Sequence, residues 1–577
     1  AMLDTNDGAY SLASTDNIFI GHYAGDGTWE NAAQNQNVAV GNYSMSGVLG
    51  EDSGGGAGDG ALYNTCVGYS AGTSITSGDS NVLIGRHAGL NITSGGNNVI
   101  IGMNTADVAE DVDYAVIIGS DACHTGNLTS NTDGVVAIGQ DALGNLTDGV
   151  LNMGIGKSAG AGITTGGGNT IIGAGAGDRC NAANANNTVV GADAFSGDHS
   201  SGSNSANVAI GQDALKGDLN SSHYNHAIGY GAMANLVSGD KNIAIGGYAL
   251  DAANGGEADN IAIGYDAIGA GDGPAVVKNI AIGNYALSAA TTHSTEVAIG
   301  YNAMLAWTGI GDGTDAAGFN IAVGYGALGS NTSSRINVAI GGDALGDHVR
   351  TDNADGYNVG IGHDAGRCLT TGIQNTFVGA LSAGTAAKSL TGHSNTAVGY
   401  LSANDLDGAA IGNTCIGKSA GEVITTGSYN TIIGYENEVA ANDRAGTVVL
   451  GSQTDSGTNN TVRIGSTTGY AELLLNGSDE DWSAASDIRL KENIEDSTIG
   501  LSFISDLRPI TYNWKKKKDV PSDMPRYKEG SDEPYNGLEV KTLYGFVAQE
   551  VKEIIDNHEL SDGQAIWSED PSGVQHL

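Results

Sequence analysis

Short apolar segments with period-two alternation recur along most of the chain, and they predict β-strands. In a phrase such as NIAIG at 242–246, two branched aliphatic residues lie two positions apart, with alanine or another variable residue between them. A strand places alternate side chains on the same face, so the two branched residues share one face. Each phrase is followed by x-x-A-L or x-x-A-G and then by a loop rich in Gly, Ser, Thr, Asn and Asp.

These phrases form an internal repeat with a period of mostly 17–20 residues. Clear copies are NIFIGHYAG at 17–25, NIAIGGYAL at 242–250 and NTCIGKSAG at 413–421. Each copy has room for two short strands and two bends, and it buries so little alone that only stacking stabilises it. We therefore predict an all-β fold, a parallel β-roll or β-solenoid shaft of about 25 rungs over 17–470, after an N-terminal lead-in at 1–16. At roughly 4.8 Å per rung, such a shaft is about 120 Å long.

Composition narrows the classes of partner and site. The chain has 91 glycines, 6 prolines and a formal net charge of −41, which argues against binding to nucleic acid or to an anionic membrane. No apolar run reaches the length of about 18 residues that spans a membrane. The five cysteines are widely spaced without a C-x-x-C pair, so neither a disulfide framework nor a zinc site is expected. We expect no cofactor and no metal site, although single acidic turns leave loose cation binding open.

The composition changes near residue 481. The segment 486–577 holds 11 of the 24 Lys and Arg residues and five of the six prolines, but only six of the 91 glycines. Within it, IGLSFISDLRPITYNW suggests a helix and then a strand, and YGFVAQEVKEIIDNH suggests a strand and then a helix. We predict a linker at 471–485 and a small α+β domain at 486–577.

Three blocks in this domain carry a resemblance to a known family: SDIRLKENI at 486–494, LSFISDLRPITYNWK at 501–515 and YGFVAQEVKEII at 544–555. In this order they resemble the intramolecular chaperone domain of phage tail spikes and fibres, the self-cleaving peptidase family S74. The resemblance implies that the domain drives homotrimerisation and is then cut off. Members usually finish in a long helical coiled coil, which the sequence up to Leu577 does not contain.

The same resemblance assigns a serine–lysine dyad to Ser486 and Lys491, with cleavage between Ala485 and Ser486. A serine hydroxyl needs a base, and a lysine serves as one when desolvation lowers its pKa toward neutrality. Asp487 and Asn493 are weaker candidates for orienting the dyad. From spacing alone, Ser486 as a helix N-cap and Lys491 as a solvated side chain would remain the simpler interpretation.

The repeat phrase resembles the head of trimeric autotransporter adhesins, a left-handed parallel β-roll in which three chains pack side by side. The resemblance implies that the aliphatic face of each rung points to a threefold interior. Two swollen intervals, 42–63 and 301–319, predict outer loops that suit a binding function. Trp29 and Trp307 are the aromatic residues considered there as receptor contacts, with local packing as the alternative.

Three functional classes follow. The first is a homotrimeric tail fibre or tail spike that binds a host cell-surface glycan or protein and other tail proteins, in the virion and, during assembly, in the host cytoplasm. Its only catalysis would be self-cleavage. The second is a polysaccharide-depolymerising spike, which needs two carboxylates in an aromatic-lined groove, and the chain holds only 5 Trp and 6 Phe. The third is a bacterial trimeric adhesin or filament, which needs a secretion signal and a C-terminal membrane anchor, for which the sequence shows no pattern.

Overall fold

The structure is a computed structural model, and it divides the chain into two units, Ala1–Ser483 and Ala484–Leu577. It describes residues 15–27, 35–47, 60–180, 184–199, 202–271, 276–291, 294–308, 318–350, 354–456, 458–474, 500–522, 527–534, 543–558, 568–569 and 575–576. Within these ranges, no helix is long and apolar enough to cross a membrane.

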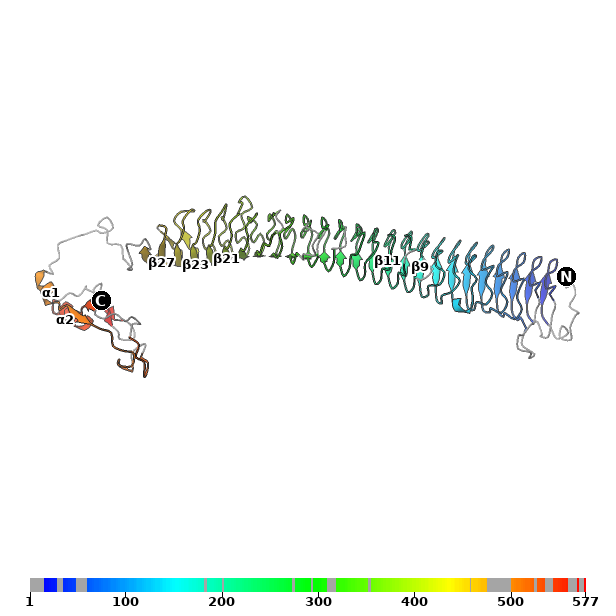
Figure 1. Ribbon diagram of the computed structural model, residues 1–577, viewed down its shortest axis with the longest axis horizontal. Helices are drawn as coiled ribbons and strands as arrows, with labels where there is room; N and C mark the ends of the chain where they lie inside the picture. The colour runs from blue at the N-terminus through cyan, green and yellow to red at the C-terminus, as the bar shows by residue number, and fades with distance from the viewer. Residues whose placement is uncertain are drawn as a thin grey trace. The chain divides into compact units, whose positions relative to one another are not determined.

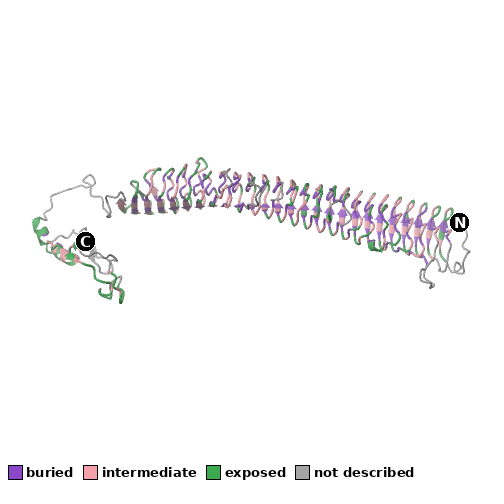
Figure 2. Cartoon of the chain, in the orientation of Figure 1, coloured by how far each residue is buried: buried purple, intermediate pink, exposed green. Residues whose placement is uncertain are grey.

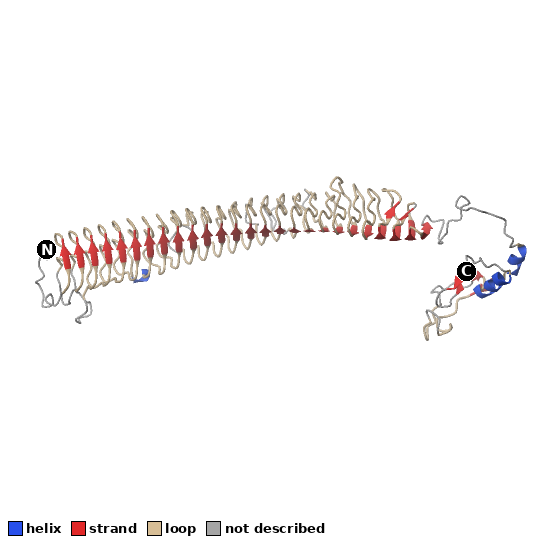
Figure 3. Ribbon diagram, turned by 180° about the vertical axis from the view of Figure 1, so that it is seen from behind, coloured by secondary structure: helices blue, strands red, loops and turns tan. Residues whose placement is uncertain are grey.

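The first unit is a parallel β-solenoid of about 24 turns, in which each turn contributes a strand to one continuous sheet (Figure 1; Figure 3). The predicted all-β solenoid is therefore confirmed. The strands are β1 (Ile18–Ile20), β2 (Val38–Val40), β3 (Thr65–Val67), β4 (Val82–Ile84), β5 (Val99–Ile101), β6 (Val116–Ile118), β7 (Val136–Ile138), β8 (Met153–Ile155), β9 (Thr170–Ile172), β10 (Thr188–Val190), β11 (Val208–Ile210), β12 (His226–Ile228), β13 (Ile243–Ile245), β14 (Ile261–Ile263), β15 (Ile280–Ile282), β16 (Val297–Ile299), β17 (Ile321–Val323), β18 (Val338–Ile340), β19 (Val359–Ile361), β20 (Thr376–Val378), β21 (Thr396–Val398), β22 (Thr414–Ile416), β23 (Thr431–Tyr435), β24 (Glu438–Val439), β25 (Val448–Ser452), β26 (Asp455–Ser456), β27 (Thr461–Ser466) and β28 (Gly469–Leu474). A short 3-10 helix, η2, covers Ser130–Thr132.

Equivalent residues of successive rungs lie directly above one another. In the middle of the shaft, Ile243 pairs with Ile261 and Ala244 pairs with Ala262, and the same register continues into β15. At the C-terminal end of the sheet, β27 pairs antiparallel with β28, unlike the parallel pairs before it. The in-line register turns each repeat position into a row of like side chains along the shaft.

The expectation of two short strands per rung is wrong for most of the shaft. Up to β22 each described rung has one three-residue strand, and a second ladder is reduced to isolated parallel bridges such as Ser205 with His223. The remaining sides are turns whose backbone bonds reach the next rung, for example from Leu250 N to Ala267 O at 3.0 Å. Repeated left-handed residues, such as Tyr248 at φ 57° and Leu250 at φ 52°, interrupt the extended backbone that a second strand requires.

Buried residues recur from rung to rung along the shaft (Figure 2). Many of them are alanines, so the core of each rung is thin. The middle strand residue faces inward, so Ala244 and Ala262 are fully buried. Ala249 and Leu250, from the x-x-A-L segment, close the interior from the other side. The two branched residues on either side of Ala244 face outward instead, and Ile245 remains 38% exposed. The single chain therefore buries the variable middle position and leaves its branched aliphatic face only partly covered.

A ladder of buried asparagine side chains holds the rungs in register. The Oδ1 atom of Asn225 accepts from the backbone N–H and from Nδ2 of Asn242, at 3.1 and 3.0 Å. The Nδ2 of Asn242 also donates to the Glu257 carbonyl at 2.7 Å, and Asn260 repeats the pattern on Asn242. Since buried polar groups are costly unless they are paired, this complete pairing explains why asparagine begins most of the phrases.

The marker glycine after each strand is required by the backbone. Gly246 has φ +139°, and a Cβ at that position would lie 2.3 Å from the carbonyl oxygen of Gly264 in the next rung. Gly264, at φ +135°, meets Gly283 in the same way. Glycine is needed here because it adopts this φ without strain and has no Cβ that would keep the two backbones apart.

The second unit is small and mixed in structure. It contains α1 (Leu501–Asp506), β29 (Ile510–Tyr512), β30 (Leu543–Gly545), α2 (Ala548–Asn557), β31 (Ser568–Glu569) and β32 (Gln575–His576). β29 and β30 pair antiparallel, as do β31 and β32. The predicted order, helix then strand and strand then helix, is confirmed for the described residues.

Candidate functional site

In the second unit, contacts bring two of the three sequence blocks together. Phe503 of α1 packs with Val551 and Ile555 of α2 in a small buried cluster. His558 Nε2 lies 2.8 Å from Asp506 Oδ2, so the end of α2 is joined to the end of α1. The paired strands β29 and β30 connect the same two blocks through the backbone. The second and third sequence blocks therefore pack against each other in this unit.

This unit keeps much apolar surface exposed for its size. Leu501 is 81% exposed and Tyr544 is 84% exposed, and Ile504 and Phe546 are also exposed. Among the described residues of this unit, the buried cluster holds only Phe503, Val551 and Ile555, beside these exposed side chains. Exposed aliphatic and aromatic side chains of this density are typical of a surface that another protein surface covers.

The predicted cleavage site lies outside the described residues. This holds for Ala485, Ser486, Asp487, Lys491 and Asn493, which fall between β28 and Gly500. Their roles in cleavage stay predictions.

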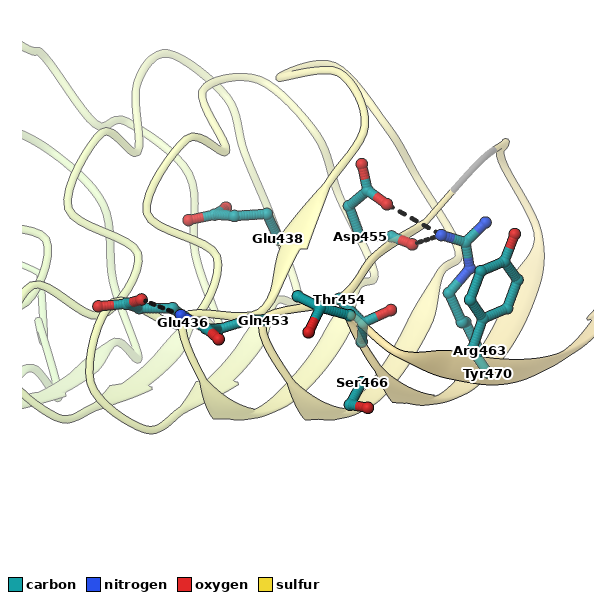
Figure 4. A pocket seen from close by; sticks show the side chains of 9 residues that line it. Glu436, Glu438, Gln453, Thr454, Asp455, Arg463, Ser466 and Tyr470 are labelled. Atoms are coloured by element: carbon teal, nitrogen blue, oxygen red, sulfur yellow. Dashed lines mark hydrogen bonds and ion pairs between the residues drawn. The ribbon is translucent and has the colours of Figure 1, made fainter.

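At the C-terminal end of the shaft, a polar pocket of about 520 Å³ opens between the last strands (Figure 4). The lining residues, in order, are Glu436, Glu438, Gln453, Thr454, Asp455, Arg463, Ser466, Thr467 and Tyr470. The Arg463 guanidinium lies over the Tyr470 ring at 4.0 Å and pairs with Glu472 and Asp455. Because its side chain is only 8% exposed, this arginine neutralises the acids around it and fastens β27 to β28.

The two glutamates of the pocket differ in acidity. Burial raises the pKa of Glu438 to about 7, against the opposing effect of hydrogen bonds from the Val423 and Glu422 N–H groups. Hydrogen bonds, first from Lys418 Nζ and then from Gln453, lower the pKa of Glu436 to about 2. A protonated acid beside an ionised carboxylate is a pattern that acid–base chemistry uses. Here both carboxylates are already held by protein donors, and Tyr470 is the sole aromatic residue among the nine that line the pocket, so the pocket is better suited to closing the shaft than to hydrolysing a glycan.

Comparison with known families decides the nature of the second unit. Residues 486–560 match the Peptidase_S74 family, described as chaperone of endosialidase. No curated protein matches the chain, and no solved structure does. A chaperone-of-endosialidase domain after a β-solenoid shaft fits a tail fibre or tail spike type of protein, and this family of domains implies trimerisation. The likeness of the repeat to trimeric adhesins has no support from the comparisons.

The two tryptophans proposed as receptor contacts have different outcomes. Trp29 lies outside the described residues. Trp307 is fully buried in the shaft, so the expectation that its ring reaches a receptor is wrong. Its position explains the difference: it closes the turn that follows Met304 and packs into the core before the long insertion begins.

The cysteines supply no nucleophile. All five are free and buried, and burial raises the pKa of Cys123, Cys180 and Cys415 to about 12. A thiol that stays protonated in an apolar core is inert. Around the described residues, no group of three or more His, Cys, Asp or Glu side chains is arranged to hold a metal ion.

Sequence reasoning missed two features that the fold assembles. The pocket beside the chaperone-of-endosialidase domain in sequence depends on pairs such as Arg463 with Glu472, which a repeat pattern does not reveal. The second is a row of exposed tyrosines along the shaft, described below. Its signal is a tyrosine one or two positions after the marker glycine in six successive copies of the phrase.

Proposed function

We propose that this chain is a structural and host-recognition protein, a homotrimeric tail fibre or tail spike shaft. The C-terminal chaperone-of-endosialidase domain drives its trimerisation and cuts itself off between Ala485 and Ser486. The observation that carries the proposal is the half-exposed aliphatic face of the solenoid sheet, which continues from rung to rung.

The geometry of that face supports association with further copies of the chain. Because the register is in line, Ile243, Ile261 and Ile280 form one row, and Ile245, Ile263 and Ile282 form a second row. Both rows point outward, since the residues between them fill the core. Continuous apolar rows of this kind mark protein interfaces. Three copies packed by these faces would cover what one thin solenoid leaves exposed.

The chaperone domain supports the same assembly from the other end of the chain. In the described part of this domain, Leu501, Ile504 and Tyr544 are exposed beside a buried cluster of three side chains. Packing of three domains through these side chains would hold three shafts together before their rungs form. Since the rungs of a solenoid make contacts mainly with their neighbours, a trimer formed at one end propagates along the shaft.

The proposed cleavage uses Ser486 and Lys491. The neutral Lys491 amine takes the hydroxyl proton of Ser486, whose Oγ attacks the Ala485 carbonyl carbon. The Ala485 acyl carbon thereby becomes bonded to Ser486 Oγ as an ester. Its bond to the Ser486 nitrogen breaks, and this nitrogen takes up a proton and becomes an amine. Water then hydrolyses the ester, which leaves an Ala485 carboxylate and a free Ser486 amino terminus. Burial of Lys491 in the assembled trimer would lower its pKa, so cleavage would follow folding.

The test is expression of the full chain as wild type, Ser486→Ala and Lys491→Ala, with Ser483→Ala and Lys515→Ala as matched controls. Denaturing gels with N-terminal sequencing, and native mass, follow each protein. We expect the wild type and both controls to separate into two fragments with a new terminus at Ser486, and the two dyad variants to stay intact as trimers.

Two results would count against the proposal. An intact wild-type chain rules out self-cleavage by this protein. A shaft that is folded and monomeric in the uncut Ser486→Ala variant rules out the trimer.

A further inference from the structure

A row of tyrosine side chains runs along the middle of the shaft. Their ring centroids are 5.2, 5.8, 5.6, 5.9 and 5.6 Å apart from one rung to the next. The members of this tyrosine row are Tyr230, Tyr248, Tyr265, Tyr285, Tyr301 and Tyr325. Each follows the marker glycine of its rung by one or two positions, so the row lies at the corner where the strand ends. Six rings at the pitch of the solenoid make a continuous aromatic surface.

Five of the six tyrosines are exposed to solvent, and Tyr285 is partly buried. The exposed fraction is 49% for Tyr230, 45% for Tyr265 and 59% for Tyr325. Small neighbours leave the rings room, since a Cβ on Gly231 would lie 3.2 Å from Cδ1 of Tyr248, and one on Gly247 would lie 3.4 Å from Cδ2 of Tyr265. The chain thus keeps side chains away from the rings on two of these rungs.

The fold itself does not require these tyrosines. The equivalent corner is Gln212 and Asp213 in the rung before the row, and it is Ala380 and Leu381 in a later rung with the same strand geometry. A contact between subunits that runs the whole shaft would repeat the same residue type on every rung, as the Ile or Val before the glycine does from β1 to β22. Tyrosines at this corner instead come in separate groups, because Tyr23, Tyr43 and Tyr69 occupy it in the first three rungs and none does in the rungs of β5 to β11. A group of six successive tyrosines that ends within the shaft indicates a local ligand.

At one end the row meets a polar hollow of about 230 Å³. Tyr325 lines it together with Ser330, Asp343, Asp347 and Arg367, among other residues. The Arg367 guanidinium pairs with Asp364 at 2.9 Å and lies 3.8 Å from Asp347. Its Nε has no hydrogen-bond partner among the described residues, and burial raises the pKa of Asp347. The hollow therefore offers both donors and acceptors next to an aromatic surface, which is the combination that fixes a polar ligand with apolar faces.

We propose that the tyrosine row and this hollow bind an extended, uncharged glycan that lies along the shaft axis. Pyranose rings have one polar rim and two apolar faces, which suit tyrosine rings and nearby carboxylate and guanidinium groups. Neighbouring rings from Tyr230 to Tyr301 lie at 70–86° to one another, so successive sugars along the row would meet ring faces and ring edges in turn. The net charge of −41 repels anionic glycans. The inference rests on the proposed function, because it names the class of host receptor and where it binds.

The test uses the full chain carrying Ser486→Ala, as the background protein, and a double variant with Tyr265→Ala and Tyr301→Ala added. Tyr429→Ala, at a tyrosine that is 65% exposed and outside the row, is the control. The probe is an array of linear oligosaccharides of known charge: uncharged hexose and N-acetylhexosamine polymers, and sialylated, uronic-acid and sulfated ones. Affinity for each bound glycan is then measured by calorimetry.

We expect the background protein to bind one or more uncharged glycans and no anionic one. The double variant should lose about tenfold or more in affinity while the control keeps it. The inference is overturned if the background protein binds no uncharged glycan or prefers anionic glycans. It is also overturned if the double variant binds with the same affinity as the background protein. Native mass separates the two proposals: a double variant that dissociates places the row in a subunit interface, and a background protein that is monomeric but binds the glycan contradicts only the trimer.

Discussion

A buried asparagine in this shaft uses all the hydrogen-bonding atoms of its side chain. Asn242 donates both Nδ2 protons, to Asn225 Oδ1 and to the Glu257 carbonyl, and its Oδ1 accepts twice from Asn260. An aspartate could not donate these bonds, and an alanine would leave the backbone groups unpaired at a cost of about 1–3 kcal/mol each. The recurrence of asparagine is plain in the sequence, but this role follows only from the in-line register.

Glu296 breaks this ladder. It occupies the asparagine position between Asn279 and Asn320, where its Oε2 accepts from the Asn320 N–H at 2.9 Å. Among the described residues, its Oε1 has no hydrogen-bond partner, nor have Nε1 of the buried Trp307 and Nδ2 of Asn320. Burial raises the pKa of Glu296 to about 8, against the smaller opposing effect of the hydrogen bonds from Asn320. At this position of the ladder the shaft therefore holds a proton that an asparagine would not need.

The substitution Glu296→Gln should change how stability depends on pH. Between about pH 4.5 and pH 8, folded Glu296 keeps its proton and the unfolded chain releases it. The unfolded state then binds fewer protons, so the wild-type free energy of unfolding falls as pH rises through this window, by at most about 1.4 kcal/mol per pH unit. The variant should lack this contribution and be more stable than wild type at pH 8, as measured by denaturant unfolding at several pH values.

Glu110→Gln, at an exposed glutamate of another rung, is the control for loss of one formal charge. It should leave the pH dependence of wild type unchanged. If Glu296→Gln and Glu110→Gln give the same pH dependence, Glu296 is ionised in the folded shaft.

At the scale of a single rung, the strand is too short to be stable alone. The strand Ile243–Ile245 forms backbone hydrogen bonds with β12 and β14. Its rung buries few apolar side chains, chiefly Ala244, Ala249 and Leu250. The marker glycine is what allows the next strand to lie so close, because a side chain there would overlap the carbonyl of the following rung. Each rung thus depends on backbone geometry as much as on apolar burial.

Gly246→Ala should destabilise the shaft strongly. The new Cβ would demand both a change from φ +139° and a shift of the Gly264 carbonyl, each of which costs roughly 1–3 kcal/mol. Hydrogen exchange should show faster opening of the rungs around β13 and β14, together with a lower unfolding temperature of the shaft.

Gly255→Ala is the matched control, because a Cβ there has nothing within 4 Å and the residue lies outside the left-handed region. It should be neutral or slightly stabilising. Similar losses in both variants would mean that a methyl group anywhere in the rung is harmful, and the close approach at Gly246 would not be the cause.

The periodic pattern predicted the elements well where the same residue types recur at the same spacing, and poorly where the residue types vary. The alternation in NIAIG and the helical spacing in AQEVKEIID were enough to place β13 and α2. The absence of a second strand could not be read, because left-handed turns are made by residues as different as Tyr248, Asp266 and Leu250. The burial of Trp307 was equally hidden, since a tryptophan beside an insertion has the same local sequence on a loop as in a core.

At the scale of the whole molecule, the exposed aliphatic rows are the feature that a single chain does not explain. The double variant Ile245→Asp with Ile263→Asp places charges on both rungs of one row, where a trimer interface would have to bury them unpaired. We expect this protein to be monomeric or to assemble far more weakly than wild type, by native mass and light scattering, while circular dichroism shows that its β-content is kept.

The control is Val237→Asp with Val349→Asp, two valines of similar exposure that lie in loops rather than on strands. It should remain trimeric. If the protein with Ile245→Asp and Ile263→Asp forms trimers as stable as those of wild type, the subunits meet through another surface.

The functional site was less accessible to sequence reasoning than the shaft. The chaperone domain was recognisable from three blocks in order, and its family match begins at Ser486, the residue assigned as nucleophile. A serine and a lysine five positions apart do not by themselves reveal a reaction, because burial of the lysine depends on surfaces that the sequence does not show. The tyrosine row escaped notice for the opposite reason, since its members occupy two different positions of the repeat and form a row only when the rungs are stacked.

The in-line register also makes the shaft a ruler. Asn225 and Asn242 are 17 residues apart and occupy equivalent places, so a tandem duplication of the codons for 225–241 would insert one complete turn without disturbing the asparagine ladder on either side. Unequal recombination between such copies changes the reach of the protein in steps of one rung and leaves both ends intact. The number of repeat copies in the gene therefore sets the length of the shaft, and lineages that carry such a shaft can change this length one turn at a time.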